Sequence, residues 1–138
     1  MKLRGLLTMG LAVVFFGVIA AACSGKQSEG FPSFGYGTAL SLESYRAAAS
    51  LPREVETKMP CYCGCEGDPT RHMSLWDCFY NQDGSYSDHA AGCDLCGKIV
   101  LDVKSEYDKG KSLKEIRAMI DSKYSVYGKP TNTPPVEE

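Results

Sequence analysis

The sequence lacks an apolar run long enough to cross a membrane. Its N-terminal apolar segment, residues 6–19, has fourteen residues, whereas a spanning helix needs roughly 20. Runs of lysine or arginine are also absent, and the formal net charge of the chain is −2. A nucleic-acid-binding protein would be expected to carry a basic patch, so nucleic acid is excluded as an expected partner.

Motifs of several enzyme classes are missing as well. The chain has no paired carboxylates, serine elbow or phosphate-binding loop, and Gly35 and Gly37 precede no suitable helix. No internal repeat or strand pattern is visible. We therefore expect a binding protein rather than an enzyme, although cysteine-based redox chemistry stays open.

The N-terminal segment predicts export from the cytoplasm. Lys2 and Arg4 precede the apolar segment, and the small residues 20–22 lead directly to Cys23. This order is typical of a secretory signal, with an uncleaved membrane anchor as the alternative. Small residues before a cysteine resemble the bacterial lipobox, in which that cysteine is acylated, palmitate being one such acyl group.

We therefore expect residues 1–22 to be a lipoprotein signal peptide and Cys23 to be the lipidation site. The mature protein would lie outside the cytoplasm, anchored through this lipid to the bacterial cell membrane, or to the outer membrane of a Gram-negative source. Without residues 1–22 the chain has 13 basic and 17 acidic residues, which again favours no nucleic-acid partner.

Composition divides the rest of the chain into three parts. Residues 23–37 are polar and rich in glycine and serine, which predicts a flexible tether. Residues 128–138 contain three prolines and little to bury, which predicts a disordered tail. Residues 38–127 form the expected domain, and at about 90 residues its stability often depends on cross-links or metals.

Periodicity predicts an all-α fold for this domain, a small helical bundle of three to four helices with a Cys-rich loop. An alanine-rich helix is expected over residues 41–51. Glycine and proline predict a loop over residues 61–70, and a short helix follows over residues 73–80. Ser74 and Asp77 have the spacing of a capping box at the start of that helix.

The longest predicted helix begins near Asp88 and ends at Gly110. Residues at steps of three and four place one face of this helix on His89, Cys93, Cys96, Val100, Val103 and Tyr107. A second capping box, Ser112 with Glu115, begins a last helix. The expected buried stripe of this last helix consists of Leu113, Ile116, Ile120 and Tyr124.

Six cysteines and both histidines of the chain fall within thirty-six residues, which marks this window as the functional centre. These eight candidate metal ligands are Cys61, Cys63, Cys65, His72, Cys78, His89, Cys93 and Cys96. Eight donors suffice for two four-coordinate sites or one thiolate-bridged cluster. Thiolates together with imidazoles favour copper or zinc, so the first interpretation is a soft-metal site.

Position supports this interpretation. Glycine allows the loop over residues 61–65 to curl, so that its three thiols can converge on one ion. On the predicted helix, His89, Cys93 and Cys96 stand at i, i+4 and i+7 and would share a face.

Disulfide staples are the first alternative, because the expected compartment is oxidising and the number of cysteines is even. Residues two apart in an extended chain have Cα atoms roughly 6.6 Å apart, at the limit for a bridge. The cysteines of residues 61–65 would therefore need partners at Cys78, Cys93 and Cys96. Staples leave both histidines without a role.

Thiol–disulfide chemistry is the second alternative. Cys93 and Cys96 form a CxxC motif at a helix start, where the helix dipole lowers a thiol pKa. No strand precedes the motif, so a thioredoxin fold is not indicated. Gly97 follows it in place of a histidine, so c-type haem attachment is not indicated either.

Residues 60–65 read Pro-Cys-Tyr-Cys-Gly-Cys, and they are followed by the cysteines and histidines named above. This pattern resembles the PCYCGC-motif lipoproteins over roughly residues 45–128. The resemblance implies an extracytoplasmic protein with a shared Cys/His cluster rather than a particular reaction. Residues 110–116, with Tyr127 and Gly128, are also similar to the small three-helix domain of cytochrome c maturation thiol reductases, which implies a helical hairpin.

The prediction is therefore an exported lipoprotein that binds copper or zinc through its Cys/His cluster. Its expected role is metal handling or delivery at the membrane surface, to an exported metalloprotein or a redox partner. The alternatives are a disulfide-stapled structural or interaction lipoprotein and a thiol–disulfide oxidoreductase linked to cytochrome maturation.

Overall fold

A computed structural model describes residues 30–65 and 72–137. The expected signal peptide, Cys23 and residues 23–29 of the expected tether lie outside the described residues. Within them the chain is helical and has no strand, so the predicted all-α class is confirmed. In chain order the helices are η2 (Ser33–Tyr36), α1 (Ala39–Ser50), α2 (Arg53–Thr57), α3 (Leu75–Phe79), η4 (His89–Gly92), α4 (Asp94–Asp108), α5 (Leu113–Tyr124) and η5 (Ser125–Tyr127).

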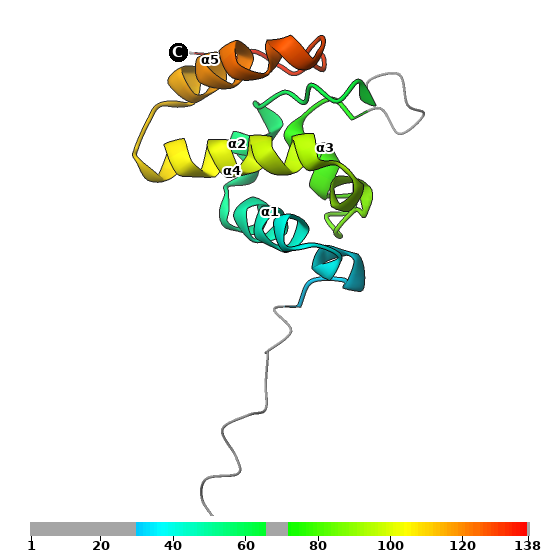
Figure 1. Cartoon of the computed structure of the whole chain (residues 1–138). Helices are drawn as coiled ribbons and strands as arrows, with labels where there is room; N and C mark the ends of the chain where they lie inside the picture. Colours follow the sequence, from blue (N-terminus) through cyan, green and yellow to red (C-terminus); the bar gives the residue numbers. More distant parts are fainter. Residues whose placement is uncertain (1–29, 66–71, 138) are drawn as a thin grey trace, which may run out of the picture. The chain divides into compact units, whose positions relative to one another are not determined.

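Helix α4 lies between α1 and α5 (Figure 1). Its buried face carries Ile99, Val100 and Val103, which meet the buried residues of the helices on either side. Among the described residues, none of the helices combines the length and the apolar character that crossing a bilayer requires.

The N-terminal part of the fold begins earlier than expected. Phe31 and Phe34 pack against Tyr45 of α1, with ring centroids 6.4 and 5.8 Å apart, and the hydroxyl of Ser41 donates to the carbonyl of Gly35 at 3.0 Å. The prediction of a flexible tether over residues 23–37 is therefore wrong from Phe31 onward. Aromatic residues in this Gly/Ser-rich segment have a core to pack against.

Helix α1 begins at Ala39 because the side chain of Thr38 accepts a hydrogen bond from the N–H of Ser41. Leu51 is extended before Pro52, as the steric demand of proline requires, and α1 ends there. Proline is tolerated just before a helix, and the short α2, which the sequence analysis omitted, follows immediately.

Helix α4 begins at Asp94, six residues later than predicted. Residues His89–Gly92 form the separate 3-10 turn η4, and Cys93 is extended with φ −125° and ψ 93°. Gly92 and the extended Cys93 interrupt the helical pattern, so His89, Cys93 and Cys96 do not share a helix face. Tyr107 is exposed, and the predicted stripe holds only from Cys96 to Val103.

Three of the predicted helix boundaries are confirmed. Gly110 (φ +76°) follows α4, and the N–H groups of Gly110 and Lys111 bond to the last turn as a Schellman motif requires. Ser112 and Glu115 form the predicted capping box of α5, and Ser74 with Asp77 forms that of α3. Ile116, Ile120 and Tyr124 of α5 are buried, and Leu113 is half-buried.

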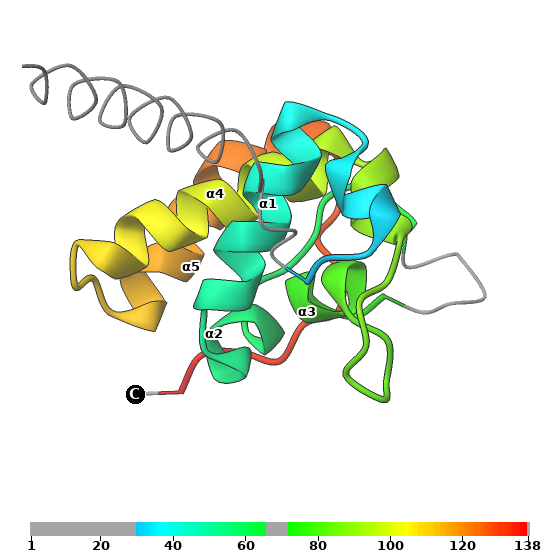
Figure 2. The same cartoon turned by 90° about the horizontal axis from the view of Figure 1, so that it is seen from below.

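The C-terminal segment is ordered over residues 128–137, so the prediction of a disordered tail over residues 128–138 is wrong for this part. Figure 2 shows the segment running past α2 and α3. Thr131 and Thr133 are buried, and the N–H of Thr131 donates to the carbonyl of Cys61 at 2.9 Å. The hydroxyl of Thr131 accepts from the N–H of Cys61 at 2.9 Å. The hydroxyls of Thr131 and Thr133 thus form hydrogen bonds with backbone groups of Cys61 and Met73, which lie outside helices and strands.

Replacing Thr131 by valine keeps the shape of the side chain and removes the acceptor of a buried N–H. We expect Thr131→Val to lower the free energy of unfolding by about 1–3 kcal/mol in denaturant titrations. Asn132→Ala, at the exposed neighbouring position, should change it by less than about 0.5 kcal/mol. Equal effects of the two variants would contradict the attachment of the tail.

Glu56 of α2 is a buried carboxyl group with 0% exposure. Among the described residues neither of its oxygens has a hydrogen-bond partner. Burial raises the pKa of Glu56 from 4.5 to about 8, so the group is neutral in the folded protein at pH 7.

This burial makes stability depend on pH. Because the pKa of Glu56 is higher in the folded protein than in the unfolded chain, its contribution is present below about pH 4.5 and is lost as the pH rises through about 8. Between pH 4 and 8 the Glu56→Gln variant should lose roughly 4 kcal/mol less stability than the wild type. Glu54→Gln, at an exposed position of α2, is the control and should follow the wild type in the same titrations.

Candidate metal centre

The loop that carries the Pro-Cys-Tyr-Cys-Gly-Cys run is fixed at its start. The N–H of Leu75 donates to the carbonyl of Met59 at 2.8 Å, which ties the loop to the first turn of α3. The two hydrogen bonds between Cys61 and Thr131 then hold the first cysteine of the run in the core, with 0% exposure.

Beyond Cys61 the loop turns at Gly64, which has φ +77°, a conformation that favours glycine. The turn brings the Cα atoms of Cys63 and Cys65 to 5.6 Å, and the two residues form a disulfide. The expectation that these cysteines would need partners elsewhere in the chain is therefore wrong. It assumed an extended chain, and the left-handed glycine shortens the separation.

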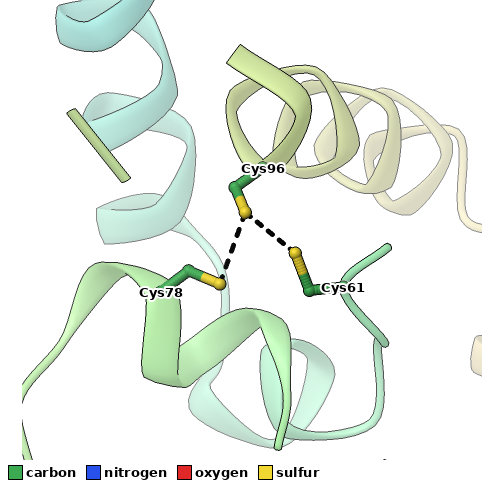
Figure 3. Close-up of side chains that lie close together, drawn as sticks. All are labelled: Cys61, Cys78 and Cys96. Carbon is green, nitrogen blue, oxygen red and sulfur yellow. Dashed lines mark hydrogen bonds between the residues drawn. The ribbon is translucent and has the colours of Figure 1, made fainter. Parts of the chain in front are cut away.

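Three thiols from three different elements meet in the core (Figure 3). Cys61 comes from the loop, Cys78 from α3 and Cys96 from the first turn of α4, and each has 0% exposure. The sulfur of Cys96 lies 2.8 Å from that of Cys61 and 3.4 Å from that of Cys78, and all three lie within 4.8 Å of one another. We call Cys61, Cys78 and Cys96 the three-thiol group.

The sulfurs of the three-thiol group lie somewhat closer together than the ligand sulfurs of a metal site. With metal–sulfur bonds of about 2.3 Å, the ligand sulfurs of a tetrahedral site lie roughly 3.8 Å apart. Small side-chain shifts would therefore let the three-thiol group surround one ion. The structure thus contains thiols close enough to bind a metal, as the sequence analysis predicted.

Hydrogen bonds within the three-thiol group separate the thiol pKa values. Hydrogen bonds from Cys78 and then Cys96 lower the pKa of Cys61 to about 3, and burial opposes this shift. The same bonds to Cys61 raise the pKa of Cys78 and of Cys96. These hydrogen bonds favour ionisation of Cys61 ahead of Cys78 and Cys96.

Cys93 stands next to the three-thiol group but is half-buried. It precedes the first residue of α4, where free N–H groups point toward it. The hydrogen bond from Cys96 lowers the pKa of Cys93 to about 6, with a further contribution from the backbone N–H of Cys96. Its sulfur lies within 4.8 Å of the sulfurs of Cys63 and Cys96.

The two histidines lie close to Cys65 and Cys78. Nε2 of His89 lies 3.2 Å from the sulfur of Cys65, and the rings of His72 and His89 are 4.1 Å apart and nearly perpendicular. His72, His89 and Cys78 offer donor atoms that lie within 4.8 Å of one another. Cys78 therefore belongs both to the three-thiol group and to a mixed group with the imidazoles.

All eight predicted donors come together in overlapping groups, although Cys63 and Cys65 pair with each other as a disulfide. Their roles as ligands stay a prediction. The sequence analysis missed Thr131, which positions Cys61 from seventy residues away. A threonine in a proline-rich segment favours no particular structure, so the sequence alone could not have shown that Thr131 contacts Cys61.

These features define a Cys/His-rich helical protein whose thiols and imidazoles are close enough to hold a metal ion. The chain belongs to the family described as a protein of unknown function with PCYCGC motif, and the match covers residues 16–136. No curated protein and no solved structure matches the chain. The resemblance to the PCYCGC-motif family is thus confirmed, while the expected lipidation and the similarity to cytochrome c maturation reductases stay predictions.

Of the four free thiols in the part of the chain that the structure describes, Cys93 is the one that is not buried. In the metal-free protein we expect iodoacetamide to modify Cys93 faster than Cys61, Cys78 and Cys96, with a rate that rises through about pH 6. Peptide mass spectrometry after short exposures locates the label. Faster labelling of Cys78 or Cys96, or a rate that rises only above pH 8, would contradict the geometry around Cys93.

Proposed function

We propose that the protein binds a soft metal ion, Cu(I) in preference to Zn(II), through the three-thiol group. The single observation that carries this proposal is the convergence of the sulfurs of Cys61, Cys78 and Cys96 in a buried position. Soft thiolate ligands favour Cu(I) and Zn(II) over hard cations. A disulfide staple within this group would use two of its sulfurs and leave the third without a role.

The number of donors favours copper. Structural zinc is almost always four-coordinate, and the three-thiol group supplies only three buried sulfurs. Cu(I) is stable with three thiolate ligands. His72 and His89 lie beside Cys78, where they can receive the ion during transfer.

The proposal includes a place of action. The charged, apolar and small residues before Cys23 support export and lipid attachment, so that the domain would handle metal at the outer surface of a membrane. An exported metalloprotein or a redox partner would then receive or supply the ion. The half-buried Cys93 and His89 give such a partner an approach to the buried thiols.

Metal content tests this function. The full chain, purified without chelators and loaded with Cu(I) under anaerobic conditions, should retain one ion per chain against a competing Cu(I) chelator. Binding depends on buried sulfurs, so Cys78→Ser and Cys96→Ser should each weaken it by at least about 100-fold. Cys23→Ala removes a cysteine outside the domain and should leave the affinity unchanged.

Two results would overturn the proposal. One is retention of Cu(I) with unchanged affinity in both Cys78→Ser and Cys96→Ser. The other is a protein that binds no metal although Cys61, Cys78 and Cys96 are shown to be reduced by thiol counting. A preference for Zn(II) over Cu(I) in competition would contradict the assignment of copper.

The place of action has its own test. Cells that express the wild type should show the protein in the membrane fraction and labelled by a radioactive or clickable palmitate. Cys23→Ala should lose the label, because the thiol that would carry the lipid is absent. Wild-type protein without label would contradict the expected lipidation, and metal binding would not be affected.

A further inference from the structure

We propose that the protein carries out an internal thiol–disulfide exchange, in which Cys93 and Cys96 reduce the disulfide between Cys63 and Cys65. This is an activity separate from metal binding, and it uses the half-buried Cys63, Cys65 and Cys93 together with the buried Cys96. The observation that carries it is the approach of a disulfide to a reduced CxxC pair within one domain.

The distances suit sulfur-to-sulfur attack. The sulfurs of Cys63, Cys93 and Cys96 lie within 4.8 Å of one another, and the distance from Cys96 to Cys63 is 3.8 Å. Disulfides exchange by attack of a thiolate on one of the two sulfurs through a mixed disulfide. No large movement of the loop or of α4 is required to bring the reacting atoms together.

The order of the steps follows from exposure. Cys93 is half-buried at the start of α4, where N–H groups favour a negative charge, whereas Cys96 is buried one turn further on. Cys93 is therefore the attacking residue, and Cys96 resolves the mixed disulfide. Two cysteines one helical turn apart can form a disulfide locally, as in other CxxC pairs.

Atoms and electrons balance within the chain. The sulfur of Cys93 gives up its proton and bonds to the sulfur of Cys63. The bond between Cys63 and Cys65 breaks, and Cys65 leaves with the electron pair and takes up a proton. Nε2 of His89, 3.2 Å away, is positioned to hydrogen-bond to this leaving sulfur.

In the second step the thiolate of Cys96 attacks the sulfur of Cys93. Cys63 leaves with the electron pair and takes up the proton that Cys96 released. Two electrons and two protons have then moved from the CxxC pair to the loop pair, and no external oxidant or reductant is consumed. The products are a Cys93–Cys96 disulfide and free thiols on Cys63 and Cys65.

One consequence rests on the proposed function. Exchange removes Cys96 from the three-thiol group and adds reduced Cys63 and Cys65, which with His89 offer donors within 4.8 Å of one another. The available ligands thus shift from the buried core toward the half-buried loop. A metal ion bound in the core would become easier to transfer after the exchange.

Trypsin makes the mixed disulfide visible. Cleavage after Lys58, Arg71 and Lys98 places the three loop cysteines in the peptide of residues 59–71 and the other three in the peptide of residues 72–98. A disulfide between Cys63 and Cys65 leaves these peptides separate. A mixed disulfide between Cys63 and Cys93 joins them.

The test uses the metal-free full chain under nitrogen, quenched with acid and then alkylated with excess iodoacetamide in denaturant at neutral pH. Cys96→Ser cannot complete the second step, so we expect its two peptides to be joined through Cys63 and Cys93. Cys93→Ser, the matched control, lacks the attacking sulfur, and its peptides should stay separate. Joined peptides in Cys93→Ser and separate peptides in Cys96→Ser would overturn the assignment of Cys93.

A measurement on the wild type does not depend on the folding of these variants. After equilibration with a single disulfide per chain, part of the peptide of residues 72–98 should carry one iodoacetamide label in place of three, because Cys93 and Cys96 are then oxidised. Three labels on every copy of this peptide would overturn the exchange. Since no metal is present, this failure would leave copper binding standing, and a failure of copper binding would leave the exchange standing.

Discussion

Two hydrogen bonds between Cys61 and Thr131 hold the start of the Cys-rich loop against the core, and the positions of the other sulfurs depend on this attachment. The loop has no helix or strand of its own to fix it, and its backbone groups would otherwise be unsatisfied in a buried place. With Cys61 held, the turn at Gly64 brings Cys63 close to the start of α4 and Cys65 close to His89 of η4. The C-terminal segment that carries Thr131, although it has no regular secondary structure, thus helps to position the cysteine cluster.

Burial of three thiols in one place creates an electrostatic problem that a metal ion resolves. Three thiolates in a volume closed to water would repel one another and lose their hydration. The pKa values are accordingly driven apart, with Cys61 ionised first and Cys78 and Cys96 kept protonated. A metal cation would replace the shared protons and compensate the charge, and its binding would add to the stability of a small domain. The buried Glu56 remains neutral because burial removes the hydration of its carboxylate.

Features that depend on residues close together in the sequence could be predicted, whereas features that depend on distant residues could not. Capping boxes at Ser74 and Ser112 and the end at Gly110 involve residues three or four apart, and all three are found where predicted. The eight donors could be selected as a set because their types and density are visible in the sequence. How the eight donors divide between a disulfide, the three-thiol group and the histidine-containing groups could not be predicted. This division depends on the extended Cys93, on the left-handed Gly64 and on contacts seventy residues apart. The order of the C-terminal segment was missed for the same reason.

X-ray absorption spectroscopy of the Cu(I)-loaded protein is the most direct test of the central claim, because it counts the atoms bound to the ion. We expect a first shell of about three sulfur atoms at about 2.3 Å, with no nitrogen scatterer of comparable weight. The shell should fall to about two sulfurs in Cys78→Ser. A first shell dominated by nitrogen, or a sulfur count that Cys78→Ser does not change, would contradict the account.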